Sequence, residues 1–215
     1  MGFKLVLTQK IVAFVLLSGS LALAAPAEAD TSVTVRLLNR AGVPRHMLET
    51  AEAEAARIFR AAGINIIWND CSVTHQCQKA PGPQELVLSI VNEGRTSSDL
   101  AYGVAFLDPD GNGKYADVFF RRVEATYRVE YGNVARLLGT VAAHELGHLL
   151  LGAHGHSSNG VMLPSWRSKT LRDVGTGSLL FTSAEATRMR TRISSGSGIR
   201  ATTEFTLVRG LGEKP

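Results

Sequence analysis

The amino-acid sequence predicts one α+β domain with a mixed, twisted sheet, a long central helix and a C-terminal helix. Apolar segments of strand length dominate the first half of the chain. Apolar residues also recur at helical spacing in longer segments, one of them in the middle of the chain. The length of 215 residues and the hydrophobic content of 45% suit a single core of this kind.

The first predicted element is a strand at 32–40, which alternates and is rich in valine. Pro44 then opens a helix that ends before Gly63, because apolar side chains recur between them every three to four residues. Short apolar strands are expected at 64–70 and 85–92. The first half therefore predicts three strands and one helix.

A hairpin is predicted from strands at 101–108 and 114–125, because the joining segment PDGNG is a strong turn signal. Together with the preceding Asp108, this segment matches early positions of a calcium-binding loop, at Asp108, Asp110, Asn112 and Gly113. Phe119 stands where that loop needs a bidentate glutamate. We therefore prefer the hairpin interpretation, with weak Ca²⁺ binding as the alternative.

Two helices are predicted in the second half of the chain. Apolar residues recur at helical spacing from about Asn133 to Gly152. Thr182 and Glu185 have the spacing of a capping box and open a C-terminal helix. Residues 195–215 are expected to form a loose tail, in which EFTLV could pair as a short edge strand.

Residues 1–29 are predicted to be a secretory signal peptide. A positively charged start precedes an apolar stretch that is too short for a permanent membrane span. Small residues follow at Ala25, Ala27 and Ala29, and cleavage is expected after Ala29, with Ala27 as the alternative site. We expect a secreted or periplasmic protein with a folded domain at 30–194 and no stable membrane anchor after cleavage; an uncleaved anchor is the alternative.

The two cysteines, Cys71 and Cys77, lie close together in a loop-like segment. In an oxidising compartment such a pair most simply forms a disulfide. A metal knuckle that includes His75 is the alternative, but it offers only three ligands at an unusual spacing. We therefore predict a disulfide that closes a surface loop.

The sequence HELGH at 144–148 is the strongest functional signal in the chain. On a helix, His144 and His148 lie on one face, about one turn apart, where two imidazoles can bind one Zn²⁺ ion. Glu145 would lie beside the metal without binding it and could take a proton from a zinc-bound water molecule. The surrounding residues are almost wholly apolar, so burial of these side chains without a metal would be unfavourable. The motif predicts a catalytic zinc ion with Glu145 as general base.

A catalytic zinc ion usually has three protein ligands, and the sequence offers three candidates for the third. His154 and His156 follow Gly152, which can adopt the left-handed conformation that turns a chain back at the end of a helix. Glu185 would correspond to the carboxylate ligand of thermolysin-like enzymes. Its place in a capping box is the better explanation for that glutamate.

The segment HELGHLLLGAH and the later VMLPSW resemble the metzincin clan of zinc peptidases, whose pattern is HExxHxxGxxH followed by a methionine turn. Four residues match the pattern: His144, Glu145, His148 and His154. Met162 matches the methionine of the turn. The sequence departs from the pattern at Leu151, which occupies the glycine position, and the glycine follows at Gly152.

A longer part of the chain, most of residues 65–193, resembles a group of exported bacterial proteins identified as metallopeptidases from their sequences. The similar segments include AFLDPDGNGKYADVFFRRV before the motif and LLFTSAEATRMR after it. In that group the helix is one residue longer, and the third histidine belongs to an HS pair that matches His156 and Ser157. The two resemblances imply different third ligands. We favour His156 over His154, because the longer turn closes more easily.

The resemblance implies a metzincin-like zincin domain in which Met162 forms a hydrophobic floor beneath the metal. It also implies that the strand YADVFF lies at the edge of the sheet and binds an extended peptide through main-chain hydrogen bonds. The function we predict is that of a secreted zinc-dependent metalloendopeptidase. The alternatives are a zinc amide hydrolase that acts on cell-wall or other non-protein substrates, and a non-catalytic secreted metal-binding protein.

The formal net charge of +4 is spread along the chain without a dense basic run, which argues against nucleic-acid binding. We expect a peptide or protein substrate, Zn²⁺ as the cofactor and a monomeric protein. Cleavage specificity and any mechanism of latency are not predicted by the sequence.

Overall fold

The computed structural model describes residues 31–71, 77, 79–94, 101–130, 133–196 and 206–207. The predicted signal peptide, residues 1–29, lies outside this part of the chain, as does most of the predicted tail. No helix in the described ranges is both long enough and apolar enough to cross a membrane.

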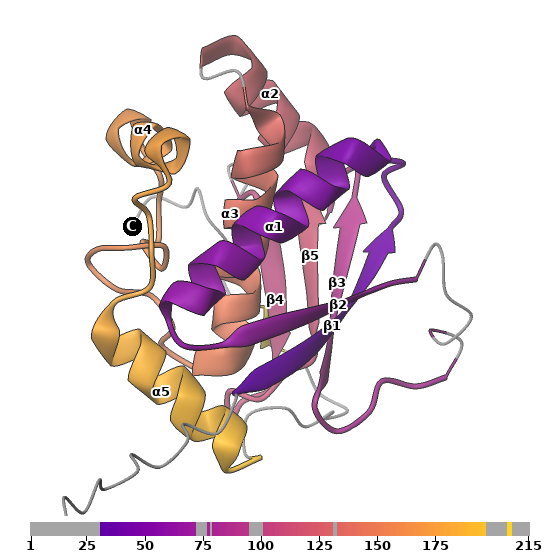
Figure 1. Cartoon of the computed structure of the whole chain (residues 1–215), viewed down its shortest axis with the longest axis vertical. Coiled ribbons are helices and arrows are strands. Elements are labelled where there is room, and N and C mark those ends of the chain that lie inside the picture. Colours follow the sequence, from indigo (N-terminus) through magenta and orange to yellow (C-terminus); the bar gives the residue numbers. More distant parts are fainter. Residues whose placement is uncertain are drawn as a thin grey trace, which may run out of the picture.

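A mixed sheet forms one layer of the domain, as the sequence predicts (Figure 1). Its strands are β1 (Ser32–Asn39), β2 (Asn65–Asp70), β3 (Glu85–Val91), β4 (Gly103–Leu107), β5 (Tyr115–Phe119) and the short β6 (Thr206–Leu207), in the order β2-β1-β3-β5-β4-β6. The pairs β1–β2, β1–β3 and β3–β5 are parallel, whereas β4 is antiparallel to β5 and to β6. The hairpin predicted around PDGNG is therefore confirmed as β4–β5.

The helices are α1 (Arg45–Ala61), α2 (Phe120–Glu130), α3 (Val134–Leu151), α4 (Ser168–Thr176) and α5 (Ser183–Ser194). The sequence predicts α1, α3 and α5, and it misses α2 and α4. The capping box at the start of α5 is present: Thr182 accepts a hydrogen bond from the Glu185 amide, and Glu185 accepts one from the Thr182 amide. The α+β class is thus confirmed, with two more helices than expected.

The strand predicted at 114–125 is wrong beyond Phe119, where the chain continues directly into α2. Val123 is buried in the main core, whereas Phe119, the last residue of β5, is buried in a separate cluster with Ala101 and Val104. Arg122 places its guanidinium 4.9 Å from the centre of the Phe119 ring and donates a hydrogen bond to the Ala101 carbonyl at 2.7 Å. These contacts hold the start of α2 against the segment that enters β4.

The position predicted for the strand YADVFF is also wrong, because β5 is not an edge strand. It lies between β3 and β4, and Ala116 pairs with Leu88 on one side and with Ala105 on the other. The hairpin places the earlier strand, β4, on the outside. An extended peptide could therefore not pair with β5.

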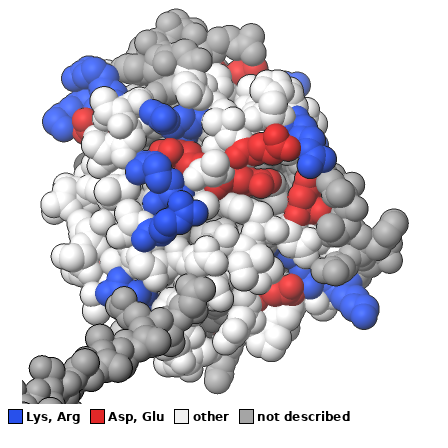
Figure 2. Space-filling model, in the orientation of Figure 1, with Lys and Arg blue, Asp and Glu red and all other residues white. Residues whose placement is uncertain are grey.

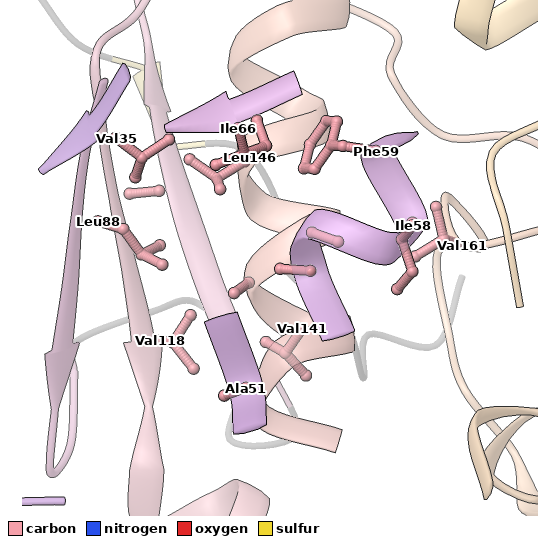
Figure 3. Packing of buried hydrophobic residues seen from close by; sticks show 14 of the residues in the cluster. Val35, Ala51, Ile58, Phe59, Ile66, Leu88, Val118, Val141, Leu146 and Val161 are labelled. Carbon is pink, nitrogen blue, oxygen red and sulfur yellow. The ribbon is translucent and has the colours of Figure 1, made fainter. Parts of the chain in front are cut away.

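The core lies between the sheet and the helices α1 and α3, which pack against each other on one face of the sheet (Figures 1 and 3). Figure 3 labels side chains from the sheet, α1, α3 and the segment after α3: Val35, Ile66, Leu88 and Val118; Ala51, Ile58 and Phe59; Val141 and Leu146; and Val161. Every residue of α3 except Arg136 is buried. Its polar side chains are therefore carried into the interior of the domain.

Cys71 and Cys77 form the predicted disulfide, with their Cα atoms 5.5 Å apart. The alternative of a metal knuckle is wrong, since neither cysteine has a free thiolate. His75 lies outside the described residues.

Figure 2 shows acidic and basic side chains on the same face of the molecule, the face in front in Figure 1. On α1 they form local pairs, such as Arg45 with Glu49 and Arg57 with Glu54, at 2.8 and 2.7 Å. This face therefore does not present a surface of one sign of charge.

Candidate metal centre

The rings of His144 and His148 lie together on one side of α3. Their centroids are 4.6 Å apart, the two Nε2 atoms are 3.0 Å apart, and both side chains are completely buried. Residues four apart on a helix face the same way, so local helix geometry produces this pair. Asn133 caps the helix by accepting a hydrogen bond from the Arg136 amide at 3.0 Å.

The protonation state of His144 follows from its hydrogen bond. Its Nδ1 lies 2.7 Å from the carbonyl oxygen of Val161. A carbonyl only accepts, so Nδ1 carries the ring proton and Nε2 presents a lone pair toward His148. Burial lowers the pKa of His144 to about 3, although the hydrogen bond to Val161 acts in the opposite direction. Neutral imidazole with a free nitrogen is the form that binds a metal.

Burial also lowers the pKa of His148 well below its ordinary value, with smaller contributions from His144 and His156. The Nδ1 atom of His148 is buried and has no hydrogen-bond partner within the described part of the chain. Its Nε2 faces the lone pair of His144 at hydrogen-bond distance. A metal ion bound by both nitrogen atoms would take the place of this hydrogen bond.

His156 completes a group of three histidines. Its ring centroid lies 5.5 Å from that of His144 and 4.6 Å from that of His148. One nitrogen from each ring can be chosen so that all three lie within 4.8 Å of one another. Zn–N bonds of about 2.0–2.1 Å in a tetrahedral site place two nitrogen ligands about 3.4 Å apart. The donor set and the spacing therefore fit a zinc ion after small movements of the side chains.

His154 lies apart from this group and is exposed. Its φ of 60° is in the left-handed region, which non-glycine residues seldom adopt. Gly152, with φ of 77°, ends α3 and donates its N–H to the His148 carbonyl at 2.9 Å. Further on, Gly155 passes so close to His148 that a Cβ there would lie 2.7 Å from Nδ1. The chain thus reverses between Gly152 and Gly155 and brings His156 back beside α3.

Glu185, the carboxylate alternative, is occupied at the start of α5. Its Oε2 accepts the Thr182 N–H at 2.7 Å, as the capping-box interpretation predicts. The group of potential metal ligands found among the described residues does not include it.

Glu145 is completely buried, and neither of its carboxylate oxygens has a hydrogen-bond partner in the described ranges. It packs against β4, where a Cβ at Gly103 would lie 2.7 Å from its Oε1. Burial raises the pKa of Glu145 well above the ordinary value, and the nearby charge of Asp117 raises it further. An acceptor of this kind is a feature of functional sites, because its hydrogen-bonding capacity is left unused by the fold.

Met162 and Trp166 follow the chain reversal between Gly152 and Gly155, and both lie against α3. Met162 is completely buried, and a Cβ at Gly147 would lie 2.7 Å from its Sδ, so it packs directly on α3. The Trp166 ring meets His144 edge-on, with centroids 5.8 Å apart, and lies 6.4 Å from Tyr102. Sequence reasoning assigned no role to Tyr102 or Gly103, since the proximity of Tyr102 to Trp166 and of Gly103 to Glu145 exists only in the folded chain.

The segment DPDGNG forms a tight turn and not an open cation loop. Asp108 Oδ1 accepts the Asn112 N–H at 2.7 Å. The guanidinium of Arg192 donates to the Gly111 carbonyl at 3.2 Å and to Asn112 Oδ1 at 3.4 Å. A cationic side chain therefore already contacts Asn112 Oδ1, an oxygen atom that the alternative of Ca²⁺ binding would require.

No protein-family model matches the chain, and no curated protein matches it. Among solved structures, the fold is similar to that of a zinc-dependent peptidase from Methanocorpusculum labreanum (strain Z), with a TM-score of 0.50 and 14% sequence identity. The alignment covers 72% of this chain and 99% of that chain. At this identity the similarity shows a shared fold.

Proposed function

We propose that this protein is an exported, monomeric zinc endopeptidase of the metzincin type. His144, His148 and His156 hold the metal, Glu145 is the general base, and Met162 lies beneath the site. The observation that carries the proposal is the group of three histidines together with a buried, unpartnered carboxylate on Glu145, the residue that follows His144. A site that only stores a metal has no need of such a carboxylate.

Glu145 is suited to proton transfer by its surroundings. When bound, zinc polarises a scissile carbonyl and lowers the pKa of a water molecule beside it toward neutrality. Glu145 follows His144 directly, and its free oxygens can accept the proton from that water molecule and pass it to the leaving amine. The contact with Gly103 limits where the carboxylate can move, so the base is held in place by β4.

The outer edge of β4 supports a peptide as substrate. Within the described residues, the short strand β6 pairs with Phe106 and Leu107 and does not extend to the earlier positions of β4. An extended peptide that adds to this part of β4 would pass Gly103, which lies against Glu145. Strand addition would thus bring a main-chain carbonyl close to the proposed base.

Export is supported by the disulfide, because cysteine pairs persist in oxidising compartments. A zinc amide hydrolase acting on cell-wall peptides would use the same residues. The amide hydrolase and the endopeptidase differ in their substrates and not in their chemistry.

The proposal is tested with the mature protein, residues 30–215, on casein or gelatin gels and on cell-wall peptides, with and without chelator. We expect chelator-sensitive clearing of the protein gels by the wild type. Glu145→Gln should bind zinc but lose activity by at least about 100-fold, in line with the loss of a general base. Glu93→Gln, which removes an exposed carboxylate paired with Arg121, is the matched control.

Cleavage of cell-wall peptides without cleavage of protein would favour the amide hydrolase. Zinc binding with no hydrolysis of either substrate would favour the non-catalytic protein. Full activity of Glu145→Gln would show that the proposed mechanism is wrong.

A further inference from the structure

Three arginines of α5 connect this helix to three other parts of the domain. Arg188 donates to the Leu151 carbonyl at 3.3 Å, Arg190 to the Ala62 carbonyl at 2.6 Å, and Arg192 to the Gly111 carbonyl at 3.2 Å. These carbonyls belong to the end of α3, the end of α1 and the β4–β5 turn. The three arginines therefore make the same kind of contact, a hydrogen bond to a main-chain carbonyl, in three different parts of the domain.

The contact of Arg192 lies against Gly152, where the chain leaves α3 toward His156. Its guanidinium donates both to the Gly111 carbonyl and to Asn112 Oδ1, and the side chain is half-buried. Burial lowers the pKa of Arg192, and Arg188 lowers it further, while Asp108 acts in the opposite direction. The protein thus keeps a partly desolvated cation at this turn, where a neutral donor would be easier to bury.

Gly152 is packed against both partners of this contact. A Cβ at Gly152 would lie 2.9 Å from the Gly111 oxygen and 3.1 Å from Cζ and Nη1 of Arg192. On the other side of the turn, a Cβ at Gly111 would collide with the main-chain nitrogen of Ala153. The two main-chain segments and the guanidinium therefore lie in direct contact, without space for a side chain between them.

This packing controls the direction in which the chain leaves α3. Gly152 is the first residue after the helix, and its φ of 77° begins the reversal. Only Ala153, His154 and Gly155 separate it from His156. A shift of Gly152 would be transmitted to the His156 ring over this short distance, and metal ligands tolerate displacements of only about 0.5 Å.

We infer that Arg192 is a positioning residue for the third metal ligand: it holds the β4–β5 turn against Gly152 and thereby sets the path of the chain to His156. The inference rests on the proposed function, because it assumes that His156 binds the metal. It also assigns a role to the DPDGNG segment, whose oxygens bind a guanidinium of the same chain. Arg192 contacts the β4–β5 turn and Gly152, and it influences the position of His156 only through Gly152.

The experiment compares Arg192→Ala with Arg190→Ala in the full mature chain. Arg190 is a matched control, since it also donates to a carbonyl beside a glycine of positive φ, Gly63 with φ of 73°. That glycine follows α1, which carries none of the proposed ligands. Zinc affinity is measured by competition with a chromophoric chelator, coordination by the visible spectrum of the Co²⁺ form, and stability by thermal unfolding of the metal-free proteins.

We expect Arg192→Ala to lower zinc affinity by about 10–100-fold, the range found when residues that orient a ligand are removed. Its Co²⁺ spectrum should lose intensity, because a displaced His156 lets solvent raise the coordination number. Arg190→Ala should lower the melting temperature to a similar degree and leave zinc affinity within about twofold. Arg192→Lys keeps the charge but not the two-acceptor geometry, so we expect an intermediate loss of about 3–10-fold.

Equal zinc affinities for Arg192→Ala and Arg190→Ala would overturn the inference. If Arg192→Ala cannot be purified, Arg192→Lys decides the matter in the same comparison, and an unchanged affinity and Co²⁺ spectrum would overturn it. Normal zinc binding by the wild type and by the Arg192 variants would refute only the role of Arg192. Absence of zinc binding by the wild type would refute the proposed function and, with it, this inference.

Discussion

Two groups of buried polar side chains lie on opposite faces of the sheet, and the fold treats them differently. On the outer face, Arg36 forms an ion pair with Glu85 and donates to the carbonyls of Lys79 and Ala80. Glu85 also accepts the Gly82 N–H at 2.5 Å. On the helix-covered face, Glu145 is more deeply buried, yet both of its oxygens lack a partner among the described residues.

The difference separates a structural group from a candidate functional one. A buried polar atom left without a partner destabilises a fold by about 1–3 kcal/mol, whereas a charge-assisted hydrogen bond stabilises it. The Arg36–Glu85 group anchors the loop before β3 and leaves only Arg36 Nε without a partner among the described residues. The group at Glu145 is unfavourable as it stands, which is expected where a metal or substrate supplies the missing partner.

The largest expected effect is the loss of zinc affinity when the proposed third ligand is removed. His156→Ala should lower zinc affinity by more than about 100-fold, since losing a ligand exceeds the loss of a residue that merely orients one. His154→Ala should change it by less than about twofold, because His154 is exposed and lies outside the histidine group. Competition titration of both variants measures this. A larger loss for His154→Ala would move the third ligand to the position that matches the metzincin pattern.

Replacement of Glu145 should show how much its buried carboxylate destabilises the metal-free protein. The pKa of Glu145 is raised in the folded state, so folding is penalised once the pH exceeds the ordinary value of 4.5 at which the unfolded chain ionises. Glu145→Gln removes this penalty and should be more stable by about 1–3 kcal/mol near pH 7.

The difference between wild type and Glu145→Gln should vanish toward pH 4.5, where both side chains are neutral. Urea unfolding of the chelator-treated proteins between pH 4.5 and 8 measures it. Parallel pH profiles would show that Glu145 ionises freely in the folded protein, and the contrast with Glu85 would then fail.

On the outer face, replacement of Glu85 should lower the free energy of unfolding, whereas replacement of Glu145 should raise it. Hydrogen bonding from Gly82, together with Arg36, lowers the pKa of Glu85, so its stabilisation is present above the ordinary value of 4.5 and is lost as the pH falls further. The Glu85 side chain is 24% exposed, which screens the pair. Glu85→Gln should therefore destabilise the protein by about 1 kcal/mol at pH 7 and leave zinc affinity unchanged. A change in zinc affinity would mean that the two faces are coupled.

The smallest expected effect concerns the backbone between His148 and His156, two of the proposed ligands. His154 has a φ of 60°, which glycine adopts freely and a β-branched residue resists. His154→Gly should alter the free energy of unfolding by less than about 0.5 kcal/mol, whereas His154→Val should destabilise by about 1–2 kcal/mol. Denaturant titration of the two variants distinguishes them. Equal stabilities would show that the turn before His156 is not constrained at this residue.

Local features of the sequence were enough to predict several parts of the molecule. The HELGH pair depends only on the 3.6-residue repeat of a helix, and the capping box of α5 depends on residues three apart. The hairpin follows from its turn residues, and the disulfide from two cysteines six positions apart. Each of these predictions involves groups that are neighbours along the chain.

The failures share the opposite property. The sequence does not show that β5 lies inside the sheet, because this depends on its pairing with β3, more than twenty residues earlier. The end of β5 was also missed, since the burial of Val123 and the contact between Arg122 and Ala101 are tertiary. Without these contacts, the segment after Phe119 could not be recognised as a helix rather than a strand.

By itself, then, the sequence determined the class of the fold and the histidine pair with its glutamate, and it indicated the chemistry that is proposed for these residues. Only the tertiary structure decided which later histidine lies beside the pair. That choice depends on Gly152, on its packing against Gly111 and on Arg192, whose positions along the chain are far apart. Helical spacing is dictated by covalent geometry within a few residues, whereas the path after a helix is set by whatever the folded chain packs against it.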